Sequence, residues 1–273
     1  MCLILVGYQP NSDLPLVVAA NRDEFHQRAS AAAEFWPQYP ELLAGKDLVA
    51  GGTWLGCTRS GKFAGLTNFN QGGEAPTTRS RGSLVHDFLI GDISALEYAQ
   101  GLPGDEYAGY NLFLFDGNEL VYTSNIEVAG CDSTQVLAPG YYALSNAELG
   151  ASWPKCVTGS QNLEATVEQD FAPADLLTML NNRQQPDDIA LPQRGQPIEH
   201  ERRLAPCFIV GDEYGTRACT AFILTKEQVT FAEQSYAAGG VATGLVQFEF
   251  ERQHASSPTQ MQNWQTTFYP KPS

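Results

Sequence analysis

The sequence predicts an α+β fold in which layered antiparallel sheets are covered by helices. Short apolar runs alternate with turn residues in the first half of the chain, helical spacing dominates the middle, and short apolar runs return towards the end. Strands joined by short turns pair in antiparallel fashion, and the apolar faces of the sheets need helices to bury them. Because no polar linker divides the 273 residues, we expect one domain over residues 1–273.

The first residues are expected to form a strand hairpin. Residues 2–8 are apolar and rich in strand formers, and a turn over 9–13 separates them from a second strand over 16–20. Further apolar runs between glycine-rich bends indicate a meander over 43–49, 53–57 and 63–67.

Helical spacing follows the meander, over 83–90 and 95–101. The turn residues Asp116-Gly117-Asn118 then predict a hairpin between strands at 110–115 and 120–123. A short strand is expected over 141–144.

The second half is expected to begin with helices and to end with strands. Helices are predicted over 153–167 and 174–181, and the proline-rich residues 186–197 indicate a loop. Strands are then expected over 207–210, 217–224 and 229–234, and the polar tail from Gln253 is expected to lie on the surface or to fray.

Composition excludes several classes of function. The net charge of −15 disfavours nucleic acids and anionic membranes as partners. The six cysteines form no CxxC motif and the four histidines lack ligand spacing, so we expect no metal and no cofactor. No apolar run approaches the roughly 20 residues of a membrane helix, and no signal peptide is visible, so a cytoplasmic location is expected.

Cys2 directly follows the initiator methionine. Removal of Met1 would give Cys2 a free α-amine, whose ordinary pKa of about 7.7–8.0 leaves it partly neutral near pH 7. A neutral amine can accept the thiol proton, as in N-terminal nucleophile enzymes. Retention of Met1 would remove this mechanism. The alternative is that Cys2 is a small hydrophobic residue that starts the first strand.

Four polar residues, Asn21-Arg22-Asp23-Glu24, follow the second predicted strand. They are typical of a solvated turn or a structural ion pair, but a hairpin would also return them to the side of Cys2. Arg22 would then lower the pKa of the Cys2 thiol. Asp23 would accept a hydrogen bond from the α-ammonium or orient Arg22.

These residues also carry a resemblance. Cys2 and the Asn21-Arg22-Asp23-Glu24 motif are followed in order by five further segments, at 51–56, 66–69, 80–82, 144–147 and 214–217. In this order they resemble the NRDE family, also named for transport and Golgi organisation. The resemblance implies a four-layer αββα N-terminal nucleophile hydrolase fold and a cytoplasmic or organellar location.

More remotely, the chain resembles bile-salt hydrolase, penicillin V acylase and acid ceramidase, which cleave non-peptide amide bonds with an N-terminal cysteine. By order, Arg22 matches their early Arg and Asn146 the Asn that serves the oxyanion, which precedes a Trp, here Trp153. Asn68 matches a second Asn, and Arg217 a late Arg. In the acylases two residues separate the early Arg from an Asp, whereas here Arg22 and Asp23 are adjacent. Either Asp23 is oriented differently, or another group takes its role.

The sequence therefore predicts an amidohydrolase that acts on a non-peptide amide of a small or lipid-like substrate. The catalytic residues expected are Cys2, Arg22, Asp23 and Asn146, and the substrate-binding residues expected are Asn21, Trp54, Asn68, Arg81 and Arg217. Three of them have bland alternatives: Asn146 as a turn or N-cap residue, Trp54 in packing, and Arg81 in a helix cap or ion pair. The alternative function is a non-catalytic protein on the same scaffold that binds haem, acyl-CoA or a lipid.

Overall fold

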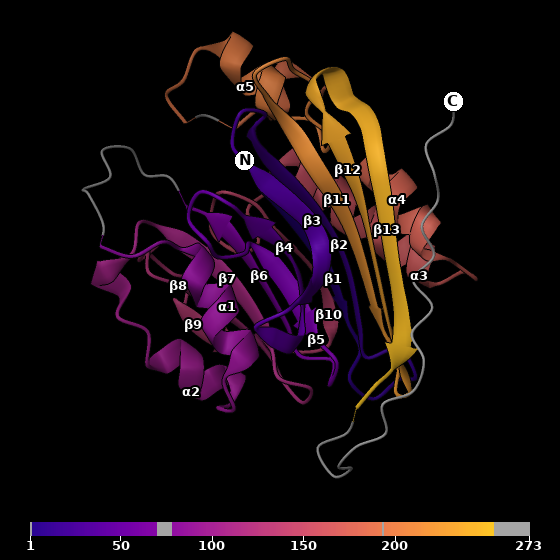
Figure 1. The fold of residues 1–273 in the computed structure, drawn as a ribbon. Coiled ribbons are helices and arrows are strands. Elements are labelled where there is room, and N and C mark those ends of the chain that lie inside the picture. The colour runs from indigo at the N-terminus through magenta and orange to yellow at the C-terminus, as the bar shows by residue number, and fades with distance from the viewer. Residues whose placement is uncertain (1, 70–77, 193, 254–273) are drawn as a thin grey trace.

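The computed structural model describes residues 2–69, 78–192 and 194–253 (Figure 1). Within these ranges the strands form two antiparallel sheets, one of six strands in the order β10-β1-β2-β11-β12-β13 and one of seven in the order β3 to β9. The strands of the first sheet are β1 (Cys2–Tyr8), β2 (Leu16–Phe25), β10 (Gly140–Leu144), β11 (Tyr214–Leu224), β12 (Gln228–Ala237) and β13 (Val241–Glu251). Those of the second are β3 (Ser30–Trp36), β4 (Tyr39–Asp47), β5 (Leu55–Thr58), β6 (Phe63–Asn68), β7 (Tyr110–Phe115), β8 (Leu120–Ser124) and β9 (Thr134–Val136).

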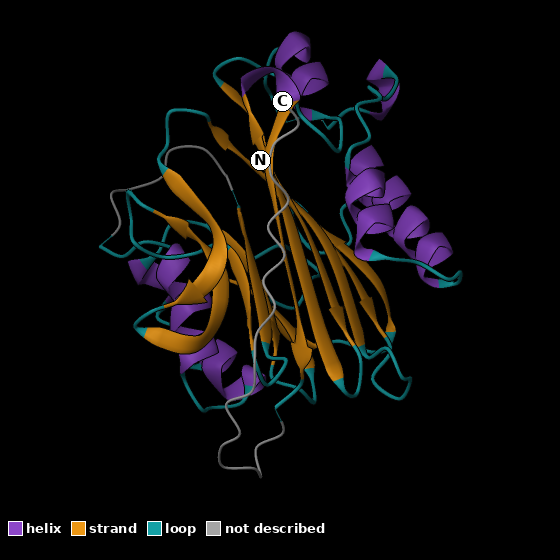
Figure 2. Ribbon diagram, turned by 45° about the vertical axis from the view of Figure 1, so that its right-hand side comes forward, coloured by secondary structure: helices purple, strands orange, loops and turns teal. Residues whose placement is uncertain are grey.

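Helices cover the outer face of each sheet, which gives the layers helix, sheet, sheet, helix (Figure 2). The helices are α1 (Gly82–Ile90), α2 (Ala95–Gln100), α3 (Pro154–Val167), α4 (Pro173–Leu180) and α5 (Ile198–Leu204), with 3-10 turns at Gly104–Glu106, Asp188–Ala190 and Ala238–Gly240. The first two pack on the seven-stranded sheet, and α3 and α4 pack on the six-stranded sheet. The predicted α+β class and αββα layering are confirmed. None of the helices in these ranges has both the length and the apolar character needed to cross a bilayer.

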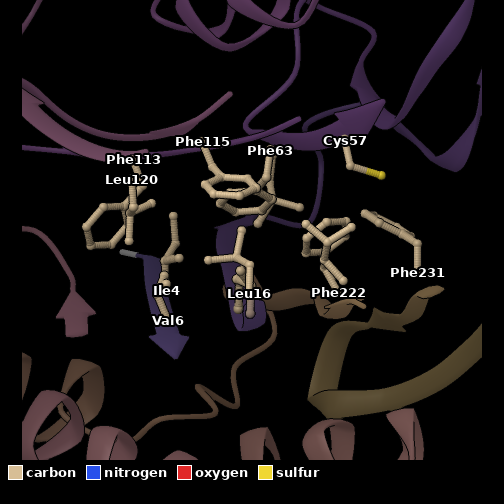
Figure 3. Close-up of a cluster of buried hydrophobic side chains, with 14 of the residues drawn as sticks. Ile4, Val6, Leu16, Cys57, Phe63, Phe113, Phe115, Leu120, Phe222 and Phe231 are labelled. Carbon is tan, nitrogen blue, oxygen red and sulfur yellow. The ribbon is translucent and has the colours of Figure 1, made fainter. Parts of the chain in front are cut away.

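Side-chain alternation along β1 connects the layers. Ile4 and Val6 belong to the core between the sheets, where they meet Phe113, Phe115 and neighbouring side chains (Figure 3). Leu3 belongs to the core under α3 and α4. Because successive strand residues point to opposite faces, Cys2 lies on the same face as Ile4, at one end of the core between the sheets.

The predicted elements differ from the structure at several places. Strand β2 continues to Phe25, so residues 21–24 lie in a strand and not in a turn. The expected strand at 207–210 is absent: the Phe208 amide donates to the Asn182 carbonyl, and Ile209 bonds to Thr216, so no ladder forms along this segment.

Three strands and one helix were missed altogether, namely β3, β9, β13 and α5. Apolar runs bounded by turns mark a strand in a sequence, and the alanine-rich β3 and the glutamate- and glycine-containing β13 lack that pattern. Apart from Gln253, the predicted polar tail lies outside the described residues.

Candidate active site

The β1–β2 hairpin places Cys2 directly opposite Arg22 in the antiparallel register. This juxtaposition is the one that the sequence predicted. Cys2 lines a cavity of about 370 Å³ that extends from β1 across the ends of both sheets. Of the predicted site residues, seven line this cavity: Cys2, Arg22, Asp23, Trp54, Asn68, Arg81 and Arg217.

Asn146 holds the backbone of Cys2. Because β10 pairs with β1, the loop after β10 lies beside the first residue of β1. The backbone amide of Cys2 donates to Asn146 Oδ1 at 3.0 Å, and Asn146 Nδ2 donates to the Asn68 carbonyl at 2.7 Å. The N-cap of α3 is Trp153, so Asn146 is not a helix cap.

A buried polar network fixes this loop. Thr67 Oγ1 donates to the Ser145 carbonyl, and Asn111 Nδ2 donates to the Ala147 carbonyl at 2.9 Å. Tyr122 in turn donates to Asn111 Oδ1 at 2.8 Å. Ser145 Oγ donates to the Cys2 carbonyl at 2.7 Å, which gives Cys2 a second anchor. The sequence offered no signal for this network because its members are scattered over three strands and a loop.

Asp23 lies one position beyond Arg22 on β2, beside the amino end of Cys2 in the register. Its Oδ1 accepts a hydrogen bond from Thr216 Oγ1 at 2.6 Å. Its Oδ2 is buried and has no hydrogen-bond partner among the described residues. Burial raises the pKa of Asp23, and the positive charges of the chain's amino terminus and of Lys155 oppose this shift.

The pKa of the Cys2 thiol is raised overall, although the sequence predicted only the lowering effect of Arg22. Burial raises it, the Asp23 carboxylate raises it further, and the positive charges of the amino terminus and of Arg22 lower it. Since desolvation is the largest cause, the thiol form is favoured. Arg22 does lower the pKa of the Cys2 thiol, as predicted, but burial outweighs this effect.

Two glycine-containing motifs form one wall of the cavity. A Cβ on Gly52 would lie 2.6 Å from the Gly82 carbonyl carbon, so the two backbones can approach this closely only because Gly52 lacks a side chain. The Thr53 amide donates to the Gly82 carbonyl at 3.3 Å. Trp54 packs against the core and also lines the cavity, and Arg81 donates to the Gly109 carbonyl at 2.9 Å.

The structure gives Asn21 a different place from the one expected. Asn21 is fully buried, and its Nδ2 donates to the carbonyls of Leu180 at 3.0 Å and Cys207 at 2.8 Å. Strand alternation turns it towards the helices, away from the Cys2 side of β2, and it does not line the cavity. The expected substrate contact of Asn21 is therefore replaced by a structural one.

Arg217 lines the cavity from a bulge in β11. Its Nη1 donates to the carbonyls of Phe25 at 3.0 Å and Arg28 at 2.8 Å, which ties β11 to the connection between β2 and β3. Burial lowers the pKa of Arg217, and the charge of Arg22 lowers it further.

Glu233 is a cavity residue that the sequence did not reveal. It is buried on β12, where its Oε1 accepts the Ala33 amide at 2.8 Å and so links the two sheets. Burial raises the pKa of Glu233, and the Ala33 amide and Arg22 oppose the shift. A single glutamate in an apolar strand carries no motif, so only the fold relates it to Cys2. Across the described ranges, no group of three or more His, Cys, Asp or Glu side chains is arranged to hold a metal ion.

The matching family model and two mammalian relatives carry the same description. The family model described as Transport and Golgi organisation 2 matches residues 1–238. The mouse Transport and Golgi organization 2 homolog is 37% identical over 259 residues, covering 86% of this chain and 93% of the relative. The human homolog is 36% identical with the same coverage. Among solved structures, the Caenorhabditis elegans ortholog of N-acylethanolamine-hydrolyzing acid amidase has a TM-score of 0.50 at 10% identity, covering 81% of this chain and 92% of its own.

Proposed function

The chain belongs to the Transport and Golgi organisation 2 family, and from this premise and the Cys2 site we propose that it is an N-terminal-cysteine amidohydrolase. The observation that carries the proposal is the environment of the Cys2 nitrogen. Asn146 Oδ1 already accepts its N–H at 3.0 Å, and the unpartnered Asp23 Oδ2 lies at the same end of β1. A free ammonium at this position could donate to two oxygen acceptors, Asn146 Oδ1 and Asp23 Oδ2. Such bonds are favourable because a buried oxygen without a hydrogen-bond partner costs free energy.

The reaction follows from these positions. The α-amine of Cys2 takes the thiol proton, and the sulfur attacks the amide carbonyl to form a tetrahedral intermediate. The amine passes the proton to the leaving nitrogen, so the substrate's amine departs and a thioester remains on Cys2. Water, deprotonated by the same amine, then cleaves the thioester and releases a carboxylic acid.

Asn146 has one further N–H, since Nδ2 carries two hydrogens and only one is used towards the Asn68 carbonyl. That donor supports an oxyanion role beside the role of holding the amine. In well-studied sites one such donor contributes about 2.7–4 kcal/mol to transition-state stabilisation.

The raised pKa of the Cys2 thiol makes the amine necessary in this proposal. A thiol whose burial disfavours the anion needs a base in contact with it, and the α-amine is the base that the position of Cys2 supplies. If Met1 is retained, the α-amine of Cys2 is not free and the thiol with its raised pKa has no such base. That case favours the second candidate, a binding protein for acyl-CoA, a lipid or haem. A cytoplasmic location is part of both proposals.

The test is hydrolysis of a panel of acyl amides by protein whose N-terminus is verified by intact mass. We expect activity only from the form that begins at Cys2. Cys2→Ala and a form with a residue before Cys2 that resists removal should both be inactive while remaining folded. Full activity of the blocked form would eliminate the amine mechanism. No activity on any amide, with ligand affinity equal in wild type and Cys2→Ala, would favour the binding protein.

A further inference from the structure

The wall of the Cys2 cavity differs in charge from the rest of the protein. The chain has 31 acidic residues and 16 Lys and Arg residues. Among the described residues, the wall contains five cations and four acids. The cations are Arg22, Arg28, Lys46, Arg81 and Arg217, and the acids are Asp23, Glu24, Asp47 and Glu233. Five of the 16 Lys and Arg residues of this acidic chain, nearly a third, therefore line one cavity.

Two of the four acids are buried. Burial raises the pKa of both Asp23 and Glu233, which favours their neutral forms. With five cations against four acids, the wall has a formal excess of one positive charge, whereas the whole chain has a net charge of −15. The cavity therefore favours anions more than the rest of the chain does.

Arg22 is the cation that the sheet register places opposite the nucleophile. Directly opposite residues on antiparallel strands have Cβ atoms about 4.5–5.5 Å apart and share a face. The Arg22 side chain is only 10% exposed, and its ion-pair contacts are long, at 3.6 Å to Asp47 and 4.0 Å to Glu24. Within the described part of the chain its guanidinium makes no hydrogen bond, although it has five N–H donors.

The neighbouring charged groups make their hydrogen bonds to other partners, which leaves the N–H donors of Arg22 unused. Asp47 is held by Arg28 at 2.7 Å and also accepts the backbone amides of Val49 and Ala50. Arg217 gives its donors to carbonyls and to Ser30. Arg22 is thus a buried cation that lines the cavity, and its N–H donors lack an acceptor among the described residues. A bound ligand can supply that acceptor.

We propose that Arg22 binds a carboxylate of the substrate and that the substrate class is N-acyl amino acids; this rests on the amidohydrolase function proposed above. A planar guanidinium pairs with a carboxylate through two parallel hydrogen bonds. The carboxylate would stand a few bonds from the amide carbonyl attacked by Cys2, on the amine side, so hydrolysis releases a carboxylic acid and an amino acid. Glu24 and Asp47, within 4.0 Å of Arg22, disfavour a doubly charged phosphate at this position.

The experiment compares amides that share one acyl group. The substrates are N-hexanoylglycine, the neutral N-hexanoylethanolamine and N-hexanoyl-aminomethylphosphonate, assayed on protein that begins at Cys2. We expect wild type to prefer the glycine conjugate over the ethanolamide by about 10- to 100-fold in kcat/KM, the range for a hydrogen bond to a charged group. Arg22→Gln should bring this ratio close to one, mainly through KM, and Arg22→Lys should give an intermediate ratio. Arg203→Gln, which removes the same charge from an exposed position on α5, should leave the ratio unchanged.

Each outcome separates the two proposals. Equal hydrolysis of the glycine conjugate and the ethanolamide by wild type, lost in Cys2→Ala, would keep the amidohydrolase and overturn carboxylate binding, even if Arg22→Gln does not fold. Preference for the phosphonate would overturn the carboxylate assignment. If wild type hydrolyses neither these compounds nor any amide of the panel described above, the proposed function fails, and calorimetry with the same three compounds tests Arg22 alone. Tighter binding of the glycine conjugate that is lost in Arg22→Gln would then support its role, and equal affinities would overturn it.

Discussion

Replacement of Asn146 tests the geometry on which the candidate site depends. Asn146→Ala removes the acceptor of the Cys2 amide and the donor to the Asn68 carbonyl, at 3.0 and 2.7 Å respectively. Each bond contributes about 0.5–1.5 kcal/mol net, and a buried group left unsatisfied adds to the loss. We therefore expect the free energy of unfolding to fall by about 2–3 kcal/mol, which corresponds to a fall of about 4–12 °C in Tm for a chain of this size.

The effect on activity should be larger than the effect on stability. Loss of one oxyanion donor lowers kcat by about 100- to 1,000-fold, and KM should change little because the donor acts in the transition state. Asn146→Asp separates the two functions of the side chain, since it keeps an acceptor for the Cys2 amine and loses the N–H donors. We expect Asn146→Asp to lose nearly as much kcat as Asn146→Ala.

Single-turnover hydrolysis and chemical denaturation of the same preparations provide the two measurements. If Asn146→Asp kept wild-type kcat, Asn146 would act only by holding the amine, and its oxyanion role would be wrong. If Asn146→Ala kept both kcat and the free energy of unfolding, the contacts to Cys2 and Asn68 would have no functional weight.

Two further substitutions test other parts of the cavity. Gly52→Ala would place a methyl group 2.6 Å from a backbone carbonyl carbon, so thermal denaturation should show that the free energy of unfolding falls by about 1–3 kcal/mol. The control is Gly244→Ala, whose methyl group would have no atom within 4 Å and should change the free energy of unfolding by less than about 0.5 kcal/mol. Equal losses in the two variants would refute the contact. Because burial raises the pKa of Glu233, the protonated carboxyl stabilises the fold at low pH, and that contribution is lost as pH rises through the folded pKa. Glu233→Gln should therefore gain stability relative to wild type as pH increases from 4 to 8, and a difference in Tm that does not change with pH would contradict the raised pKa.

Local patterns in the sequence determined much of the fold. The apolar run of β1, the turn after it and the apolar start of β2 were enough to pair Cys2 with Arg22, because a short hairpin fixes its own register. Helices α1, α2, α3 and α4 were likewise expected within a few residues of their observed bounds. The ordered motifs from Cys2 to residue 217 indicated the family, which the comparisons confirm.

Only the tertiary structure decided which groups share the cavity and in which direction burial shifts their pKa values. Asn21 and Arg22 are neighbours in one motif, yet strand alternation sends Asn21 towards the helices and Arg22 into the cavity. Glu233 joins them from β12, far away in the sequence. The pKa of Cys2 rises although a cation stands opposite, because desolvation depends on how the two sheets close over the thiol. Spacing along a chain records local pairing, whereas burial and long-range contact arise only when separate elements pack together.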